Sequence, residues 1–382
     1  MDHKNPKQMM RTFGWASFLN DFGSDMIFPV WPVFVTKVLG ANMAVLGFLD
    51  GMGETLVSLS HGLAGYWSDR IRKRKVFIWV GYLCATLSRL GYALSTNWTQ
   101  LIPFRALDRM GKIRSAPRDA IIADLSIREN RGRYFGFLRT MDNFGALCGI
   151  LVCIFLIEKI GYQKLFLLAA LPSALGVVLI LRRISEQIPA QKIYQGVKIK
   201  VLNLSFLLFL ILSAVFSLGS FSYSFLLMSA GEAGFKNTSI PILYLLFTAV
   251  ATFSSLPFGY LADRISRKAV LLISFLLWAG ICALFIFGGN KWLILIAFIL
   301  YGLQRGSLDT VQRAFVAELV PEEYRASCLG GFGLVTGVCA LPASWGAGIL
   351  WETLGRGAPF IFSLATTGVA LGLLLFVREQ GT

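Results

Sequence analysis

The sequence predicts an all-α membrane protein with twelve transmembrane helices in two six-helix bundles that are related by pseudo-symmetry. Three observations support this prediction. Hydrophobic residues make up 55 % of the 382 residues, and apolar runs near twenty residues long recur along the chain. Such a run is long enough to cross a bilayer as a helix. A short loop motif also occurs twice, and Lys and Arg gather in particular loops.

The repeated motif shows that the chain contains two copies of one unit. Residues 65–75 and residues 259–268 both contain Gly-x-x-x-Asp-Arg followed by basic residues. An offset of 194 positions pairs Gly65 with Gly259, Asp69 with Asp263, Arg70 with Arg264 and Arg74 with Lys268. The same offset pairs Asp124 with Glu318 and Arg131 with Arg325. A constant register over such a distance indicates an internal repeat.

Each copy contains six apolar runs. The first half gives predicted spans at 12–37, 44–66, 76–95, 98–119, 134–157 and 164–182. The second half gives 202–227, 239–261, 269–288, 291–313, 326–350 and 357–377. We therefore expect an N-terminal bundle over 1–181, a polar and basic linker over 182–201 and a C-terminal bundle over 202–382.

The distribution of basic residues predicts the orientation. Lys and Arg are concentrated in the N-terminal segment, in the two motif loops and in the linker. The opposite side has only Lys37, Lys159, Lys164, Lys236, Lys291 and Arg356. Because cytoplasmic loops carry the excess of positive charge, both termini are expected in the cytoplasm. The net charge of +15 lies in these loops, so we expect no nucleic-acid partner.

The paired loop motifs, one after span 2 and one after span 8, resemble those of the major facilitator superfamily. The resemblance covers essentially the whole chain and implies a monomeric transporter of the bacterial inner membrane. Segments 21–29, 108–120 and 141–146 are similar to a branch of bacterial permeases. That branch reads Asp-Arg-x-Gly-Lys-Gly-x-Arg-x-x-Pro-Arg-Asp-Ala in span 4, whereas Ile113 follows Lys112 here. Gly145 and Gly149 match an exporter motif of span 5 whose proline is Ile150 in this chain.

The resemblance implies a cytoplasmic gate. Asp69 would cap the N-terminus of span 11, where a carboxylate suits the helix dipole. Asp124 and Glu318 would pair with Arg74 and Lys268 when the cytoplasmic ends of the two halves meet. The predicted gate residues are Gly65, Asp69, Arg70, Arg74, Asp124, Arg131, Gly259, Asp263, Arg264, Lys268, Glu318 and Arg325.

Charged residues also occur deep within the spans of the first half. At 1.5 Å per residue, Asp21 lies roughly 14 Å into span 1. The full set is Asp21, Asp25, Asp50, Glu54, Arg89, Arg105, Asp108, Arg109, Arg139 and Asp142. Ten lipid-facing charges would cost on the order of 30 kcal/mol, which exceeds the stability of a typical protein. We therefore expect them to face the bundle interior or water and to pair in part.

The second half has few such charges. Only span 10 keeps ions, Arg305 and Asp309, next to Gln304. Aromatic residues are available instead, namely Phe216, Phe221, Tyr223, Phe225, Tyr244, Phe247 and Tyr301. These residues predict a substrate and proton pathway with one ionic wall and one aromatic and polar wall.

The six acids of the ionic wall outnumber its four arginines. Asp108 is expected to pair with Arg105 and Arg109, and Asp142 with Arg139. Of the remaining acids, Asp21 and Glu54 lie nearest the midplane. A buried carboxylate without a cation tends to hold a proton, so Asp21 or Glu54 is the predicted proton carrier.

We therefore expect a secondary transporter that moves a small amphipathic or anionic organic solute by alternating access, coupled to protons and without a cofactor. A transporter of a metal ion or a metal-siderophore chelate is the alternative, because Asp21, Asp25, Asp50 and Glu54 could supply oxygen ligands. The chain has no His-Glu-x-x-His or Gly-x-Ser-x-Gly motif, which argues against an enzyme. A sensor or scaffold without transport would not need both gate motifs.

Overall fold

The computed structural model describes residues 6–71, 73–126, 130–186, 203–287, 290–321 and 324–377. Within these ranges the chain is helical and contains no strand, which confirms the all-α class. The helices form two compact units. The first unit contains Met1–Gly40 and Leu56–Lys192, and the second contains Ala41–Thr55 and Ile193–Thr382. The second unit thus includes a short segment from the N-terminal half of the chain.

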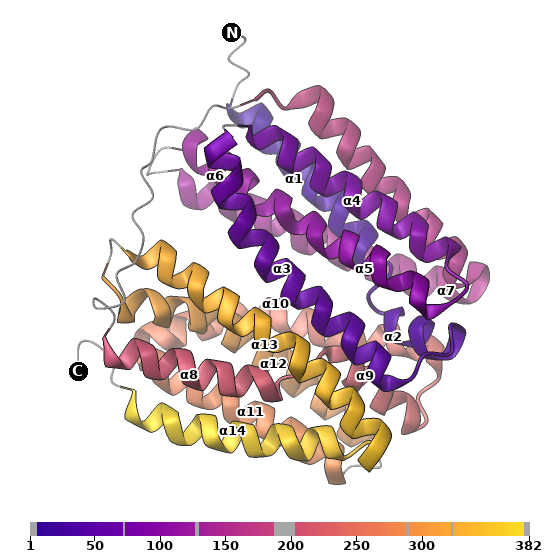
Figure 1. The fold of residues 1–382 in the computed structure, drawn as a ribbon, viewed down its shortest axis with the longest axis vertical. Coiled ribbons are helices and arrows are strands. Elements are labelled where there is room, and N and C mark those ends of the chain that lie inside the picture. Colours follow the sequence, from indigo (N-terminus) through magenta and orange to yellow (C-terminus); the bar gives the residue numbers. More distant parts are fainter. Residues whose placement is uncertain are drawn as a thin grey trace. The chain divides into compact units, whose positions relative to one another are not determined.

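The first unit is built around three long helices that lie side by side, α1, α4 and α7 (Figure 1). Its elements are α1 (Pro6–Asp25), α2 (Trp31–Val33), the π-helix η1 (Phe34–Val38), α4 (Arg74–Leu94), the 3₁₀-helix η2 (Trp98–Gln100), α5 (Leu101–Met110), the 3₁₀-helix η3 (Gly111–Arg114), α6 (Ser115–Leu125) and α7 (Arg131–Arg183). Helix α7 consists of two helices joined at Gly161, whose φ of 74° favours glycine.

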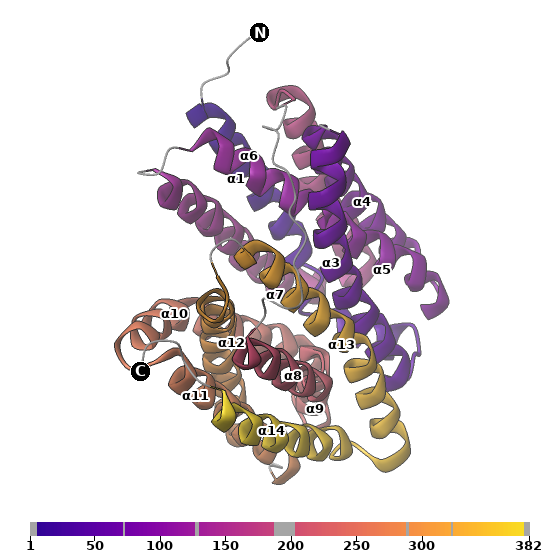
Figure 2. The same cartoon turned by 60° about the vertical axis from the view of Figure 1, so that its left-hand side comes forward.

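In the second unit α12 packs against α10 and α11, while α8 packs against α13 and α14 (Figure 2). Its elements are α8 (Leu204–Gly219), α9 (Tyr223–Glu232), the 3₁₀-helix η5 (Asn237–Ser239), α10 (Ile240–Arg264), α11 (Arg267–Phe287), α12 (Lys291–Leu319), α13 (Arg325–Leu354) and α14 (Ala358–Phe376). Side-chain caps start three of them. Asn203, Ser222 and Asn290 accept backbone N–H bonds at the starts of α8, α9 and α12.

Helix α3 (Met43–Ile71) runs through both units. Its segment up to Thr55 belongs to the second unit, and the segment from Leu56 onwards belongs to the first. The helix itself is continuous over its 29 residues. A single rigid element is therefore shared by the two units.

Every predicted span overlaps a helix, and three spans are interrupted. Span 1 breaks after Asp25, span 4 contains the 3₁₀-helix Gly111–Arg114, and span 7 breaks after Gly219. Among the described residues, eight helical segments are long and apolar enough to cross a membrane, and the segment Gly132–Arg183 covers two predicted spans. The charged helices α1, α3 and α5 are not among the eight.

The core of the first unit gathers large apolar side chains from α1, α4, α6 and α7. Its fully buried members include Phe13, Ile78, Tyr82, Ile121 and Ile180. The charged part of the first unit therefore adjoins a dry apolar core, which fixes the helices that carry the ionic side chains.

Two glycines of α7 let it approach α1 closely. A Cβ atom on Gly145 would overlap the carbonyl oxygen of Phe18, and one on Gly149 would overlap that of Phe22. Glycines four residues apart allow two helix backbones to come together in a membrane.

We predict that Gly149→Ala weakens this packing. The added methyl group must push α1 and α7 apart, which lowers the free energy of unfolding by about 1–3 kcal/mol. Thermal unfolding of the purified protein in detergent measures the effect. Gly136→Ala on the same helix is the matched control, because a Cβ there meets nothing within 4 Å. Equal unfolding temperatures for the two variants would contradict the close approach.

Candidate functional site

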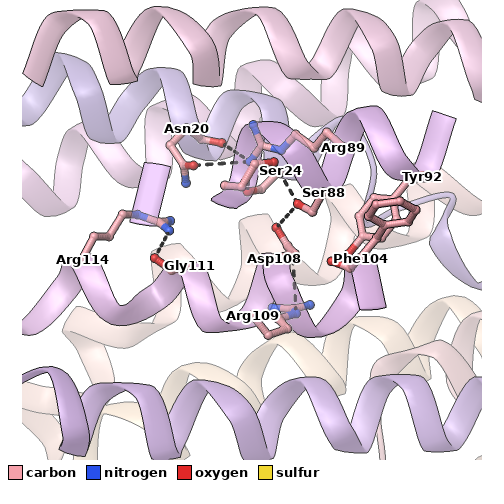
Figure 3. A network of polar contacts seen from close by, with 11 residues as sticks. Asn20, Ser24, Ser88, Arg89, Tyr92, Phe104, Asp108, Arg109, Gly111 and Arg114 are labelled. Carbon is pink, nitrogen blue, oxygen red and sulfur yellow. Dashed lines mark hydrogen bonds and ion pairs between the residues drawn. The ribbon is translucent and has the colours of Figure 1, made fainter. Parts of the chain in front are cut away.

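Arg89 of α4 is the centre of a buried polar network in the first unit. Its side chain is 1 % exposed. The guanidinium donates to the carbonyl oxygen of Asn20 at 2.9 Å, to Ser24 Oγ at 2.7 Å and to the carbonyl oxygen of Ala169 at 3.2 Å (Figure 3). These bonds join α1, α4 and α7. Because α1 ends at Asp25, a cation here also faces the negative end of the helix dipole.

A glycine in span 1 makes room for this arginine. A Cβ atom on Gly23 would overlap the Arg89 guanidinium and the carbonyl oxygen of Ala169. The glycine of the segment 21–29 therefore has a steric reason. The sequence predicted a buried Arg89, but not that it would hold the end of α1.

Asp108 is buried beside the same network. Ser88 Oγ donates to Asp108 Oδ1 at 3.4 Å, and Arg109 Nε lies 3.6 Å from Asp108 Oδ2 (Figure 3). The expected pairing of Asp108 with Arg109 is present. The printed contact of Arg105 is with an aromatic ring instead, since its Cζ lies 4.3 Å from the ring centroid of Trp31.

The arginines of span 4 rest on the aromatic side chains that follow α1. Arg109 Cζ lies 4.8 Å from the ring centroid of Phe28, in the turn between α1 and α2. Arg105 and Arg109 are buried, at 1 % and 7 % exposed. Such cation–π contacts stabilise a guanidinium most when it is removed from water. The break in span 1 thus packs directly on the charged face of α5.

Asp142 takes a different partner from the predicted one. Arg139 is exposed, whereas Arg118 of α6 reaches Asp142 at 4.0 Å and also donates to Asp119 at 3.0 Å and to Ser17 Oγ at 2.5 Å. The prediction that Arg139 serves Asp142 is therefore wrong. Residues three apart on one helix share a face only when their side chains point the same way.

The acids of span 1 are placed within the first unit. Asp21 is half-buried and accepts a hydrogen bond from Asn20 Nδ2 at 2.9 Å, while Asp25 is buried at the end of α1. Glu54 of α3 belongs to the second unit and is exposed. Hence the four acids of spans 1 and 2 do not share one environment.

Asp50 is the most deeply buried of these acids, at 2 % exposed. It belongs to the part of α3 that lies in the second unit. Its Oδ2 accepts hydrogen bonds from Ser222 Oγ at 2.7 Å and from Ser224 Oγ at 2.5 Å. Both serines stand at the start of α9, where the positive end of the helix dipole favours an anion.

The second unit has an aromatic face beside the charged pair of α12. The ring centroids of Tyr244 and Phe247 lie 4.9 Å apart, and those of Phe247 and Tyr301 lie 5.0 Å apart. One turn beyond Tyr301, Arg305 Nη2 lies 3.6 Å from Asp309 Oδ2. The side chains of Arg305 and Asp309 are 45 % and 61 % exposed.

The other predicted residues of this wall are packed inside the unit. Gln304 is buried, Phe216 stacks on Phe275 at 4.3 Å, and Phe221 contacts Phe225 at 5.3 Å. Tyr223 meets Tyr244 at 5.3 Å and extends the aromatic face. The aromatic side chains therefore form one packed layer, and the charged pair lies at its edge.

The loop residues form ion pairs within each unit. Arg74 donates to Asp124 at 2.6 Å in the first unit. In the second unit Glu318 pairs with Arg267, whereas Lys268 donates to the carbonyl oxygens of Leu375 and Val377. The prediction that Lys268 pairs with Glu318 is wrong, because Lys268 reaches the end of α14 instead.

These pairs also correct the predicted condition for their formation. Both exist inside a single unit, so neither needs the two halves to meet. Arg325 is bonded in the same local way, since its Nε donates to the carbonyl oxygen of Ala317 at 2.8 Å. Arg70 and Arg264 are exposed, and Gly259 is half-buried. The side chains of Gly65, Asp69 and Arg131 lie outside the described residues.

Comparison with known proteins identifies the family. The sequence model of the Major Facilitator Superfamily matches residues 13–251 and 207–382. The chain belongs to the Major Facilitator Superfamily. An uncharacterized MFS-type transporter of Methanocaldococcus jannaschii is 34 % identical over 389 residues, covering 98 % of this chain and 97 % of the relative. The protein is therefore a multi-pass membrane transporter and not an enzyme.

Two further members illustrate the range of the superfamily. A probable 4-methylmuconolactone transporter of Cupriavidus pinatubonensis is 23 % identical over 396 residues, with 95 % of this chain and 90 % of the relative covered. The crystal structure of the nucleoside transporter NupG matches with a TM-score of 0.84 at 15 % identity, over 97 % of this chain and 100 % of that one. The second comparison shows the shared fold.

Within this superfamily fold, several residues at the site were missed by sequence reasoning. Ser222 and Ser224 carried no signal beyond their position after Gly219, the last residue of α8. Arg114 is buried, with its Cζ 4.9 Å from the ring centroid of Tyr82, although it lies in a basic run that suggested a loop. Arg118 lies in the same run. The residues 108–120 of the permease-like segment could have identified both arginines as interior.

We predict that Arg89→Met destabilises the protein. The carbonyl oxygens of Asn20 and Ala169 would stay buried without their charged donor, which costs about 2–3 kcal/mol. Apparent unfolding temperature in detergent should fall for Arg89→Met and fall less for Arg89→Lys. Arg139→Met on α7 is the control, because that side chain is exposed. If Arg89→Met and Arg139→Met unfold at the same temperature, the network is not what holds α1.

Proposed function

We propose that this protein is a proton-coupled secondary transporter that moves a small amphipathic or anionic organic solute by alternating access. The observation that carries the proposal is the exposure of Arg305 and Asp309. Arg305 is the central residue of α12, which is long and apolar enough to cross a membrane. A charge exposed to lipid at that depth would cost about 2.5–3.5 kcal/mol, so its neighbourhood is expected to be aqueous.

The chemistry near Arg305 suggests the class of solute. Tyr301 and Phe247 provide apolar ring faces, and Arg305 provides a fixed cation one turn away. A solute with a flat apolar part and a carboxylate would use both. The relative named as a probable 4-methylmuconolactone transporter also moves a small organic molecule, which agrees with this class.

The proposal includes orientation and proton coupling. The excess of Lys and Arg in the motif loops and the linker favours cytoplasmic termini in the cytoplasmic membrane. Asp21 is half-buried and Glu54 is exposed, so water can reach both. Either carboxylate is suited to exchange protons during transport.

A metal ion is not the favoured cargo. Among the described residues, no group of three or more His, Cys, Asp or Glu side chains could hold a metal ion. Asp50, one of the four candidate ligands, instead accepts two serine hydroxyl groups. No observation on the described residues therefore supports a direct metal site, and the organic solute is preferred.

We predict that Arg305→Gln abolishes carboxylate recognition. The probe is benzoate, followed by a panel of small aromatic and aliphatic carboxylates, in a thermal-shift assay and in uptake by proteoliposomes. Losing the cation should weaken binding at least about tenfold, which corresponds to 1.4 kcal/mol. Arg305→Lys should retain part of the affinity, and Arg356→Gln in the loop before α14 should bind normally. If Arg305→Gln responds to every carboxylate as the unmodified protein does, the solute class is wrong.

We also predict that Asp21→Asn or Glu54→Gln uncouples transport from the pH gradient. Without its proton carrier, the protein should still exchange labelled for unlabelled solute across the liposome membrane but should not accumulate it. Flux in both modes is measured with a solute found in the thermal-shift panel. Uphill accumulation by both single variants would refute a carrier at these two positions.

A further inference from the structure

The position of α3 raises the question of what holds its first part on the second unit. Residues Met43–Thr55 belong to the second unit, although the rest of this helix belongs to the first. A helix satisfies its backbone hydrogen bonds internally. The attachment of this segment therefore depends on side-chain contacts and close packing.

Close packing against α13 supplies one part of the attachment. A Cβ atom on Gly47 would overlap the carbonyl group of Ser344, and one on Gly51 would meet the backbone of Ala340 and Leu341. From the other side, a Cβ on Gly348 would overlap the backbone of Met43. These glycine contacts are insensitive to pH.

Hydrogen bonds supply the second part. Thr55 Oγ1 donates to the carbonyl oxygen of Gly337 at 2.8 Å, and the Met43 N–H donates to Glu352 Oε1 at 2.7 Å. Glu352 is exposed at the end of α13. The remaining anchor is Asp50, whose Oδ2 receives both Ser222 Oγ and Ser224 Oγ.

The Asp50 anchor is built into the start of α9. Ser222 Oγ accepts the N–H of Ser224 at 3.2 Å while it donates to Asp50, and the N–H of Ser222 donates to Ser344 Oγ at 3.2 Å. The carboxylate thus ends a chain of hydrogen bonds that includes α13. Hydrogen bonds to an ionised acceptor are roughly twice as strong as neutral ones.

We propose that Asp50 is a proton-controlled anchor that holds the first part of α3 on the second unit when ionised and releases it when protonated. A proton on the carboxyl group removes the negative charge from the start of α9 and turns two charge-assisted hydrogen bonds into neutral ones. The inference rests on the proposed proton-coupled transport for its purpose, but the anchor can be measured without any transport.

The surrounding elements carry several other ionisable groups. They are Glu54 on α3, Tyr223 and Glu232 on α9, Tyr244 on α10, Cys339 and Glu352 on α13, and Tyr301, Arg305 and Asp309 on α12. Glu54 and Glu352 are exposed, whereas Asp50 is buried. Among these carboxylates only Asp50 accepts the hydroxyl groups that start α9, so its protonation acts on that contact directly.

A pair of labels can report the anchor. The rings of Phe48 and Trp345 lie 5.8 Å apart, on α3 and α13. Nitroxide labels at Phe48→Cys and Trp345→Cys, in a background without the six native cysteines, should broaden each other's electron paramagnetic resonance spectrum. The label chemistry is completed at one pH and the spectra are then compared between pH 8 and pH 5.

We predict that the broadening is strong at pH 8 and declines toward pH 5. Asp50→Asn should show weak broadening at both values, with the released population at pH 8 increased about tenfold through weaker hydrogen bonds. Glu54→Gln is the matched control one turn away and should keep the normal pH response. Ser222→Ala combined with Ser224→Ala should behave like Asp50→Asn, and this variant decides the question if Asp50→Asn does not fold.

Three outcomes would overturn the anchor. These are broadening that does not change with pH, a normal pH response in Asp50→Asn, or a normal response in the double serine variant. The transport proposal fails separately. If the labels respond as predicted but proteoliposomes show no movement driven by a pH gradient, the anchor stands and the proposed coupling does not.

Discussion

The buried guanidinium of Arg89 is the interaction on which the first unit depends. A helix interrupted inside a membrane leaves backbone carbonyl groups without water to bind them. Arg89 answers this at the end of α1 by bonding the carbonyl oxygen of Asn20, and Gly23 leaves the space that the guanidinium needs. The same side chain bonds Ala169, so the break in α1 is held in place by two other helices.

The second unit meets the same constraint with an anion. Helix α1 ends at Asp25 and α8 ends at Gly219, positions that the repeat offset of 194 pairs. In the second break the new helix α9 begins at once, and Asp50 faces its N-terminal serines. A cation at the C-terminus of one helix and an anion at the N-terminus of another both oppose the exposed end of a helix dipole. Interrupted helices at corresponding repeat positions are common at transporter binding sites, which supports the proposed function.

The sequence predicted the helices well because a membrane span leaves a long apolar run, and the repeat confirmed where one unit gives way to the next. It predicted interior charges for a similar reason, since Arg89 and Asp108 have no stable place in lipid. Their partners were less predictable. Asp142 uses Arg118 from α6 and Glu318 uses Arg267 because direction and distance in three dimensions decide pairing, whereas spacing along one helix does not. The 3₁₀ turn Gly111–Arg114 likewise reflects packing, because Gly81 of α4 contacts Gly111 closely there.

Helix α3 shows why a boundary in the sequence need not be a boundary in contacts. Its glycines Gly47 and Gly51 let α13 approach without any side chain to order, so this packing can form and separate with little conformational entropy. Such a surface gives little resistance by itself to separation. A buried carboxylate added to it contributes strength that depends on charge, because Asp50 binds its serines most tightly when ionised. Weak, reversible packing combined with one titratable contact is therefore suited to a helix that must change partners during a transport cycle.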